Sequence, residues 1–385
     1  MRSQLCLSLW LASMLSLTAS AARQAIPPEA ARHFTEAKQA EARGDWPSAE
    51  REYQEALKLA PEWAEARVNL GVVLNRQDRS DEAIKQFMRA AEINPKLAAA
   101  LLNLGITYFR RARYEEALPP LSRALELDQT NMQGRQLLAL TLIALERFQA
   151  AADHLERLRA LEDKNGAVLL ALGQAYLRLK LYNKAVERLG ELVRLTPDSP
   201  KAHMLLGEAL DNAGESERAT LEFRRAVELD SRLAEAHYAL GYALLKKGDT
   251  EEAAREFERE LEINPEFMLA RYQLAKIRLS RGRTDEAAAM LERVIAAAPD
   301  FRPALEALGQ ALLKKRDSTR AVEVLERAVK LDPNYPDVRV LLGRAYMAAG
   351  RKEDAQKEFA AAQRLGEEER KRLEEKVSNQ KSKKP

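Results

Sequence analysis

The sequence predicts an all-α chain in which antiparallel helix pairs stack into a solenoid. Three observations support this fold class: a period of 34 residues, small residues at two fixed positions of each period, and a composition dominated by Ala, Leu, Glu, Arg and Lys. Gly and Pro number only 16 and 15 in 385 residues, whereas the abundant residues are strong helix formers. A period of this length is typical of helical repeats, in which each unit buries its apolar face against the next.

Ten consecutive units of 34 residues begin at residue 30 and follow one another without insertion or deletion. Position 20 is Ala in every unit, position 8 is Gly in seven units and Ala in three, and position 24 is always large and apolar. In the second unit these residues are Gly71, Ala83 and Phe87. The units are 30–63, 64–97, 98–131, 132–165, 166–199, 200–233, 234–267, 268–301, 302–335 and 336–369.

The small residues at fixed positions indicate that two helices approach closely. Gly inside a helix costs about 0.5–1 kcal/mol relative to Ala, so its recurrence at position 8 implies a contact that a side chain would block. Ala at position 20 gives the matching small surface on the second helix, and position 24 fills the space one turn further on. Gly at position 15, as at Gly44, is expected to end the first helix, and Pro at position 32, as at Pro61, the second.

On these residues the chain resembles the tetratricopeptide repeat family, whose pattern W-x2-L-G-x2-Y…A-x3-F…A…P is matched over essentially all of 30–369. The resemblance implies a right-handed superhelix of helix pairs with a concave groove that receives extended peptides or partner helices. Position 4 is never Trp, and the fourth unit matches least well. In four units position 32 is not Pro but Gln129, Asp163, Ser231 or Glu367. In four units position 27 is not Ala but Leu158, Leu192, Glu260 or Val294.

The N-terminus differs from the repeats and predicts a signal peptide over 1–22, followed by a linker over 23–29. An apolar run without charge extends to Arg23, and Ala19-Ser20-Ala21 supplies a small-residue cleavage site. Cys6, the only cysteine, lies inside this run, so the cleaved chain would contain no thiol, as suits an oxidising compartment. We therefore expect export to the periplasm or the extracellular space; an uncleaved membrane anchor is the alternative.

The C-terminus supplies a cover for the last repeat, which would otherwise expose the face that a neighbour buries. Leu373 and Val377 continue the register at positions 4 and 8 among charged residues. This pattern predicts a short capping helix over 367–377, so that 370–385 is a charged capping segment followed by a basic, disordered tail. Contact with a membrane surface or a polyanion is expected only through this tail, and solvation of the tail is the simpler interpretation.

The sequence contains no catalytic constellation, and we expect neither an enzyme nor a cofactor, metal or small-molecule substrate. His33, His203 and His237 all occupy position 4 of separate units, which places them apart and favours packing over shared ligation. His154 is isolated on a second helix. There is no phosphate-binding loop or nucleophile elbow, and a net charge of +3 gives no reason to expect nucleic-acid binding.

The candidate binding surface is formed by first-helix positions that lie off the packing stripe, namely 2, 5, 9, 12 and 13. Apolar residues at positions 5 and 9 with cations at position 13 would suit a segment with apolar anchors and acidic groups; ordinary packing is the alternative for the apolar ones. Asn at position 6 of two consecutive units resembles the start of an asparagine ladder that clamps a peptide backbone. The candidates are Val68, Asn69, Val72, Arg76, Leu102, Asn103, Ile106, Arg110, Leu140 and Arg178, with a second patch at Tyr238, Tyr242, Lys246 and Tyr272.

Together these features predict a scaffold that binds a protein or peptide partner in the groove, in the cell envelope or outside the cell. The rival prediction is a structural spacer within an envelope assembly for secretion, pilus formation or polysaccharide export.

Overall fold

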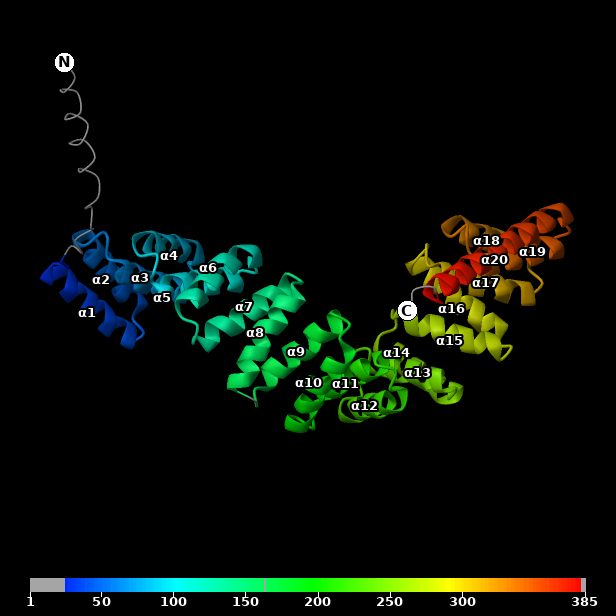
Figure 1. The fold of residues 1–385 in the computed structure, drawn as a ribbon, viewed down its shortest axis with the longest axis horizontal. Helices are drawn as coiled ribbons and strands as arrows, with labels where there is room; N and C mark the ends of the chain where they lie inside the picture. Colours follow the sequence, from blue (N-terminus) through cyan, green and yellow to red (C-terminus); the bar gives the residue numbers. More distant parts are fainter. Residues whose placement is uncertain (1–24, 163, 382–385) are drawn as a thin grey trace, which may run out of the picture. The chain divides into compact units, whose positions relative to one another are not determined.

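The computed structural model describes residues 25–162 and 164–381, without the side chains at 373 and 376–381. Its regular structure over these residues is entirely helical, and consecutive helices run antiparallel in pairs (Figure 1). The signal peptide expected over 1–22, with Cys6, lies outside the described residues. Among the helices that are described, none combines the length and the apolar character needed to cross a bilayer.

The chain divides into two compact units, which are described separately. The first, 1–179, holds nine helices among its described residues. They are α1 (Pro28–Ala42), α2 (Trp46–Leu59), α3 (Ala64–Arg76), α4 (Ser80–Ile93), α5 (Ala98–Arg110), α6 (Tyr114–Leu127), α7 (Met132–Ala144), α8 (Phe148–Leu161) and α9 (Gly166–Arg178).

The second unit, 180–385, contains eleven helices in its described part. They are α10 (Tyr182–Leu195), α11 (Pro200–Asn212), α12 (Ser216–Leu229), α13 (Ala236–Lys247), α14 (Thr250–Ile263), α15 (Met268–Ser280), α16 (Thr284–Ala297), α17 (Arg302–Lys314), α18 (Ser318–Leu331), α19 (Pro336–Ala348) and α20 (Lys352–Lys381). Within each unit, helices that follow one another in the chain pack together, so the core lies between successive helices.

The core contact within a helix pair joins the small residue at position 8 to the large residue at position 24. A Cβ added to Gly71 would lie 2.5 Å from Cε1 of Phe87, and one added to Gly207 would lie 2.6 Å from Cδ1 of Phe223. The Ala residues at position 20 are fully buried in all ten units. The predicted close approach of the two helices is therefore present, and an aromatic or Leu side chain occupies the space that Gly leaves.

We predict that Gly207→Ala lowers the free energy of unfolding by about 1–3 kcal/mol, because the new Cβ would overlap the Phe223 ring. Gly190 in α10 is the matched control, since a Cβ there would meet only Nη1 of Arg194, at 3.9 Å. Gly190→Ala should raise stability by up to about 1 kcal/mol through helix propensity alone. Thermal and urea unfolding followed by circular dichroism measures both, and shifts of the same sign would contradict this packing.

Every turn between the two helices of a repeat contains one residue in the left-handed conformation, at position 15. Five of these residues are Gly, with φ between 74° and 89°. The other five adopt the same conformation without being Gly, with φ between 55° and 62°: Asp78, Ala112, Glu146, Lys180 and Arg316. This conformation costs a non-Gly residue roughly 1–2 kcal/mol, so the packing of the flanking helices, rather than Gly itself, determines the turn.

Helix α13 begins at Ala236, whereas the first helices α3 to α11 and α15 to α19 begin at the first residue of their unit. The cause is Glu260, one of the departures from Ala at position 27. Its buried carboxylate accepts hydrogen bonds from the backbone N–H groups of Glu235 (3.3 Å) and Tyr238 (3.2 Å). A carboxylate at a helix N-terminus is favourable, so Glu260 caps α13 from the second helix of the same repeat.

The C-terminal segment is helical over the residues expected to cap the last repeat. Helix α20 starts as the second helix of the last repeat and continues without a break to Lys381. The expected capping helix over 367–377 is a continuation of α20, and 378–381, expected to be disordered, are helical. Glu367 stands where other repeats have Pro, and Gly366 is helical, so no residue here ends the helix.

Candidate partner-binding face

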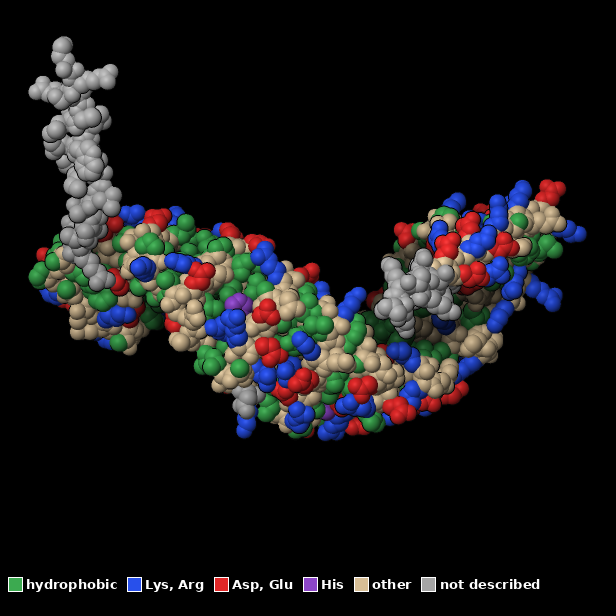
Figure 2. Space-filling view, in the orientation of Figure 1, with side chains coloured by type: hydrophobic (Ala, Val, Ile, Leu, Met, Phe, Trp, Pro, Cys, Tyr) green, Lys and Arg blue, Asp and Glu red, His purple; other side chains and the backbone are tan. Residues whose placement is uncertain are grey.

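The first helices of neighbouring repeats touch one another as well as their own second helices. These contacts join α3 to α5, α5 to α7 and α7 to α9 in the first unit, and α11 to α13, α15 to α17 and α17 to α19 in the second. Side chains at positions 2, 5, 9 and 13 of successive first helices therefore form a surface, which we call the first-helix face. Figure 2 shows Lys, Arg, Asp and Glu side chains intermingled over the visible surface.

The apolar candidates of the first unit differ in how far they are available to a partner. Val68 is buried and belongs to the core around Phe87. Val72 is half-buried against the same core, and Leu102 packs against the core around Leu121. Half-buried Ile106 and Leu140 lie further along the face. Packing thus accounts for Val68 fully and for the others in part.

The two candidate asparagines do not present equivalent amides. Asn103 donates a hydrogen bond of 2.8 Å from Nδ2 to the Ala99 carbonyl of its own helix. Asn69 is half-buried one repeat earlier. The hydrogen bond between these two first helices comes instead from Asn75, whose Nδ2 donates to Oγ1 of Thr107 at 2.7 Å. An asparagine clamp would require Asn103 to exchange its intrahelical bond for a peptide.

Arg76 and Arg110 provide exposed positive charge on adjoining helices. Neither forms an ion pair with any described residue, although the Arg76 guanidinium lies 5.9 Å from the centre of the Trp46 ring. Arg178 stacks on Phe148 at 4.9 Å and approaches Glu146 at 3.4 Å. The two free guanidinium groups beside Val72 and Ile106 are therefore the part of this patch best suited to an acidic partner.

The aromatic patch of the second unit is held together by its own contacts. The rings of Tyr238 and Tyr242 stack with centroids 6.1 Å apart, and Tyr238 meets Phe267 edge-on at 5.1 Å. Tyr242 is 40% exposed. Nζ of Lys246 lies 5.7 Å from the Tyr242 ring and binds the carboxylate of Asp211 at 2.7 Å, so its charge is already balanced.

A cavity of about 310 Å³ opens on the first-helix face between α15 and α17. Of the candidates, only Tyr272 lines it, together with residues that the sequence analysis did not select. The Lys276 ammonium lies 5.5 Å from the Tyr272 ring, and burial raises the pKa of Glu306 above its ordinary value. The remaining polar lining comes from Ser280, Gln310 and Lys314.

Lys276, Glu306 and Gln310 occupy positions 5 and 9, which the repeat register had already marked as facing the groove. They were missed because apolar residues were sought at these positions. The signal that could have found them is Glu306, the one acidic residue at position 5 in the ten units, next to the polar residues Lys276 and Gln310 at position 9.

The position 4 histidines are hydrogen-bonded links within the core. Nδ1 of His203 pairs with Glu222 at 2.6 Å and Nε2 with the Pro197 carbonyl at 2.9 Å. His237 repeats this arrangement with Glu256 at 2.6 Å and the Ser231 carbonyl at 3.0 Å. Each ring therefore ties its own second helix to the last turn of the preceding repeat.

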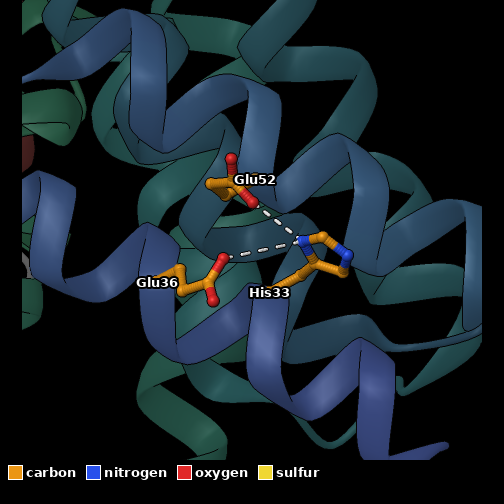
Figure 3. Close-up of side chains that lie close together, drawn as sticks. All are labelled: His33, Glu36 and Glu52. Carbon is orange, nitrogen blue, oxygen red and sulfur yellow. Dashed lines mark hydrogen bonds and ion pairs between the residues drawn. The ribbon is translucent and has the colours of Figure 1, made fainter.

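His33 forms the same kind of link at the start of the chain (Figure 3). Its Nδ1 lies 2.8 Å from the carboxylate of Glu52 and 3.9 Å from that of Glu36. These three side chains are close enough to hold a metal ion. The recurrence of the His–Glu pair in two other repeats, without a third carboxylate, indicates a structural link instead.

We predict that stability falls as the pH rises through the folded-state pKa of His237. Hydrogen bonding to Glu256, aided by the Ser231 carbonyl, raises this pKa above the ordinary value of 6.5. The contribution is therefore complete below about pH 6.5 and is lost above the folded-state pKa. The thermal unfolding midpoint should fall as the pH rises from about 6 to 9, and Glu256→Gln should make this fall smaller.

The matched control is Glu251→Gln, because Glu251 is an exposed residue of the same helix that pairs with Arg281. An NMR titration of the His237 ring would show the midpoint directly. A midpoint at or below 6.5, or one that Glu256→Gln leaves unchanged, would contradict the role of this pair.

Comparison with known proteins identifies the repeat. Family models described as Tetratricopeptide repeat match 64–130, 142–209, 200–232, 234–267, 272–336 and 312–371. Among solved structures, the MamA 41-end fragment from Desulfovibrio magneticus RS-1 is 25% identical, covering 44% of this chain and 96% of its own, with a TM-score of 0.42. Naa15/Naa10 bound to HypK-THB is 18% identical, covering 87% and 63%, with a TM-score of 0.48. No curated protein matches the sequence.

Proposed function

Because the chain belongs to the tetratricopeptide repeat family, we propose that it is a non-enzymatic scaffold that holds a segment of a partner protein on its first-helix face. Proteins with this fold generally serve as interaction scaffolds. The observation that carries the proposal is the pair of unpaired, exposed guanidinium groups of Arg76 and Arg110 beside the half-buried Val72 and Ile106.

The chemistry of this patch defines the segment it would take. Arg76 and Arg110 can each bind a carboxylate through two parallel hydrogen bonds. Val72 and Ile106 retain exposed apolar surface, which a Leu or aromatic anchor would cover. We therefore propose a partner segment in which acidic residues flank an apolar anchor.

The cavity between α15 and α17 supports the same mode of binding in the second unit. Tyr272 offers an aromatic wall, and Lys276 and Lys314 supply cations at its edge. Burial raises the pKa of Glu306 above its ordinary value, and its carboxylate is balanced by the Arg302 guanidinium at 3.5 Å. An acidic or hydrogen-bonding side chain of the partner would therefore find positive charge at this end as well.

We predict that a photo-crosslinking residue at Ile106 or Tyr242 gives discrete protein adducts in the native host, because both lie on the first-helix face. The matched controls are Met88 in α4 and Leu221 in α12, exposed apolar residues of second helices (44% and 63% exposed). The Ile106 adduct should disappear when Arg76 and Arg110 are both changed to Glu. It should persist when Lys58 and Lys85, which are exposed on second helices, are changed to Glu.

Adducts that form equally well from Met88 and Leu221, or that survive reversal of Arg76 and Arg110, would overturn the proposed binding face. Adducts confined to crosslinkers in the terminal helices α1 and α20 would favour the rival function, a spacer that docks by its ends. Circular dichroism of each variant checks that the fold is unchanged.

We propose that the scaffold acts in the periplasm or outside the cell, on the basis of the apolar N-terminal run and its Ala19-Ser20-Ala21 site. Expressed in a bacterium with a general secretion pathway, the full chain should be recovered from the periplasm, shortened by about 22 residues in intact mass. A chain that begins at residue 23 should stay in the cytoplasm. Recovery of the uncleaved chain from the membrane fraction would support the N-terminal anchor instead.

A further inference from the structure

A recurrent polar link joins position 4 of the first helix to position 23 of the second. In five repeats a cationic or imidazole side chain at position 4 hydrogen-bonds to an acceptor at position 23, at 2.6 to 3.0 Å. The acceptor satisfies the hydrogen-bonding group of the position 4 side chain, which is largely buried within the repeat. The five pairs are His33–Glu52, Arg67–Gln86, His203–Glu222, His237–Glu256 and Arg339–Glu358.

Two repeats have a cation at position 4 but no acceptor at position 23. In the eighth, position 23 is Met290, and Glu266 lies 3.9 Å from the Arg271 guanidinium. In the fourth, position 4 is Arg135 and position 23 is His154. Arg135 is 93% buried, since only 7% of it is exposed, and it donates one hydrogen bond, to the Gln129 carbonyl at 2.6 Å. Among the described residues it has no carboxylate partner. A buried guanidinium without a counter-charge is costly, because several N–H groups leave water together.

His154 contributes a second polar group without a partner at the same place. Its Nδ1 is buried and forms no hydrogen bond within the described part of the chain. Burial lowers the pKa of His154, and so do the Arg135 and Arg157 guanidinium groups, while Asp153 acts in the opposite sense. The neutral ring can place a proton on Nδ1 and donate it to an incoming oxygen.

These groups line a cavity of about 310 Å³ between α6, α7 and α8. Ser122, Gln129, Arg135, His154 and Arg157 can all donate hydrogen bonds, and two leucines complete the wall. Glu126 is the carboxylate of the lining, but it is 63% exposed and paired with Arg123 at 2.6 Å. The cavity therefore carries an excess of donors and of positive charge.

We propose that this cavity binds one oxyanion, a carboxylate or a phosphate, which supplies the acceptor that position 23 provides in the five repeats with a polar link. Arg135 and Arg157 present planar donor pairs that match the oxygens of either group. Ser122 and His154 would bond the remaining lone pairs. The oxyanion can belong to a free metabolite or to an acidic side chain of a partner, and the test below separates these sources.

The site is distinct from the first-helix face, because its lining comes from α6, the turn after α6, and positions 4, 7, 23 and 26 of the fourth repeat. Arg76 and Arg110 are not part of it. Failure of the binding-face proposal would therefore leave this one standing, and the reverse also holds.

The test follows the ring signals of the four histidines by NMR in the full chain labelled with 13C-histidine. The probes are inorganic phosphate, succinate and N-acetylglutamate amide, each against chloride at equal ionic strength. We expect a saturable shift of the His154 signal with at least one oxyanion, while the signals of the paired His203 and His237 stay fixed. Tightest binding of phosphate or of succinate indicates a free anion, and that of the glutamate amide indicates an acidic side chain.

Two variants decide whether the effect arises in this cavity. Arg157→Gln should weaken binding by roughly tenfold or more, because it removes a charge-assisted hydrogen bond. Arg147→Gln, which removes an exposed charge that pairs with Glu115 outside the cavity, should leave it unchanged. His154→Glu would restore an acceptor at position 23, so it should raise the thermal midpoint without any anion. The oxyanion should raise the midpoint of the wild type but not that of this variant.

Three results would overturn the proposal. One is a His154 signal that no oxyanion moves, or that chloride moves equally. Another is equal weakening by Arg157→Gln and Arg147→Gln, which would indicate diffuse charge attraction. The third is a His154→Glu variant whose thermal midpoint still rises with the oxyanion as the wild type does.

Discussion

The contact on which the structure depends is the packing of a large side chain at position 24 against Gly, or in three repeats Ala, at position 8. The Phe87 ring occupies the space that a Cβ on Gly71 would need, and Phe223 does the same against Gly207. Helices that approach so closely bury their small residues completely, and the Ala at position 20 is fully buried in every repeat. Because each pair is closed by this internal contact, the outer sides of both helices remain for other uses.

Those outer sides have different roles in the two helices of a repeat. First helices of neighbouring repeats touch one another, so their positions 5, 9 and 13 form a shared surface. Part of that surface is packing, as the burial of Val68 shows. In another part the charges are balanced by ion pairs within the protein, as between Lys246 and Asp211. What is left for a partner is concentrated in a few places, such as Arg110 and the cavity beside Tyr272.

Features that repeat every 34 residues could be predicted from the sequence, because the same pattern of small and large residues occurs in all ten units. The Gly71, Ala83 and Phe87 pattern led to the helix pair directly. Features that arise once could not be predicted, since they depend on neighbours in space. The Lys246–Asp211 ion pair joins residues 35 apart on different helices, and the capping of α13 by Glu260 needs a bond from the second helix back to the first. The continuation of α20 beyond the last repeat follows from the absence of a residue that ends the helix there.

The left-handed turn residue has a consequence for how the surface can vary. Five repeats hold this conformation without Gly, and four of those residues are charged: Asp78, Glu146, Lys180 and Arg316. The backbone shape does not depend on the side chain, which is exposed at Asp78, Lys180 and Arg316, while Glu146 also lies 3.4 Å from Arg178. Natural variation can therefore reverse or remove charge at these corners and so alter the electrostatic field around the protein, while the spacing of its helices is preserved.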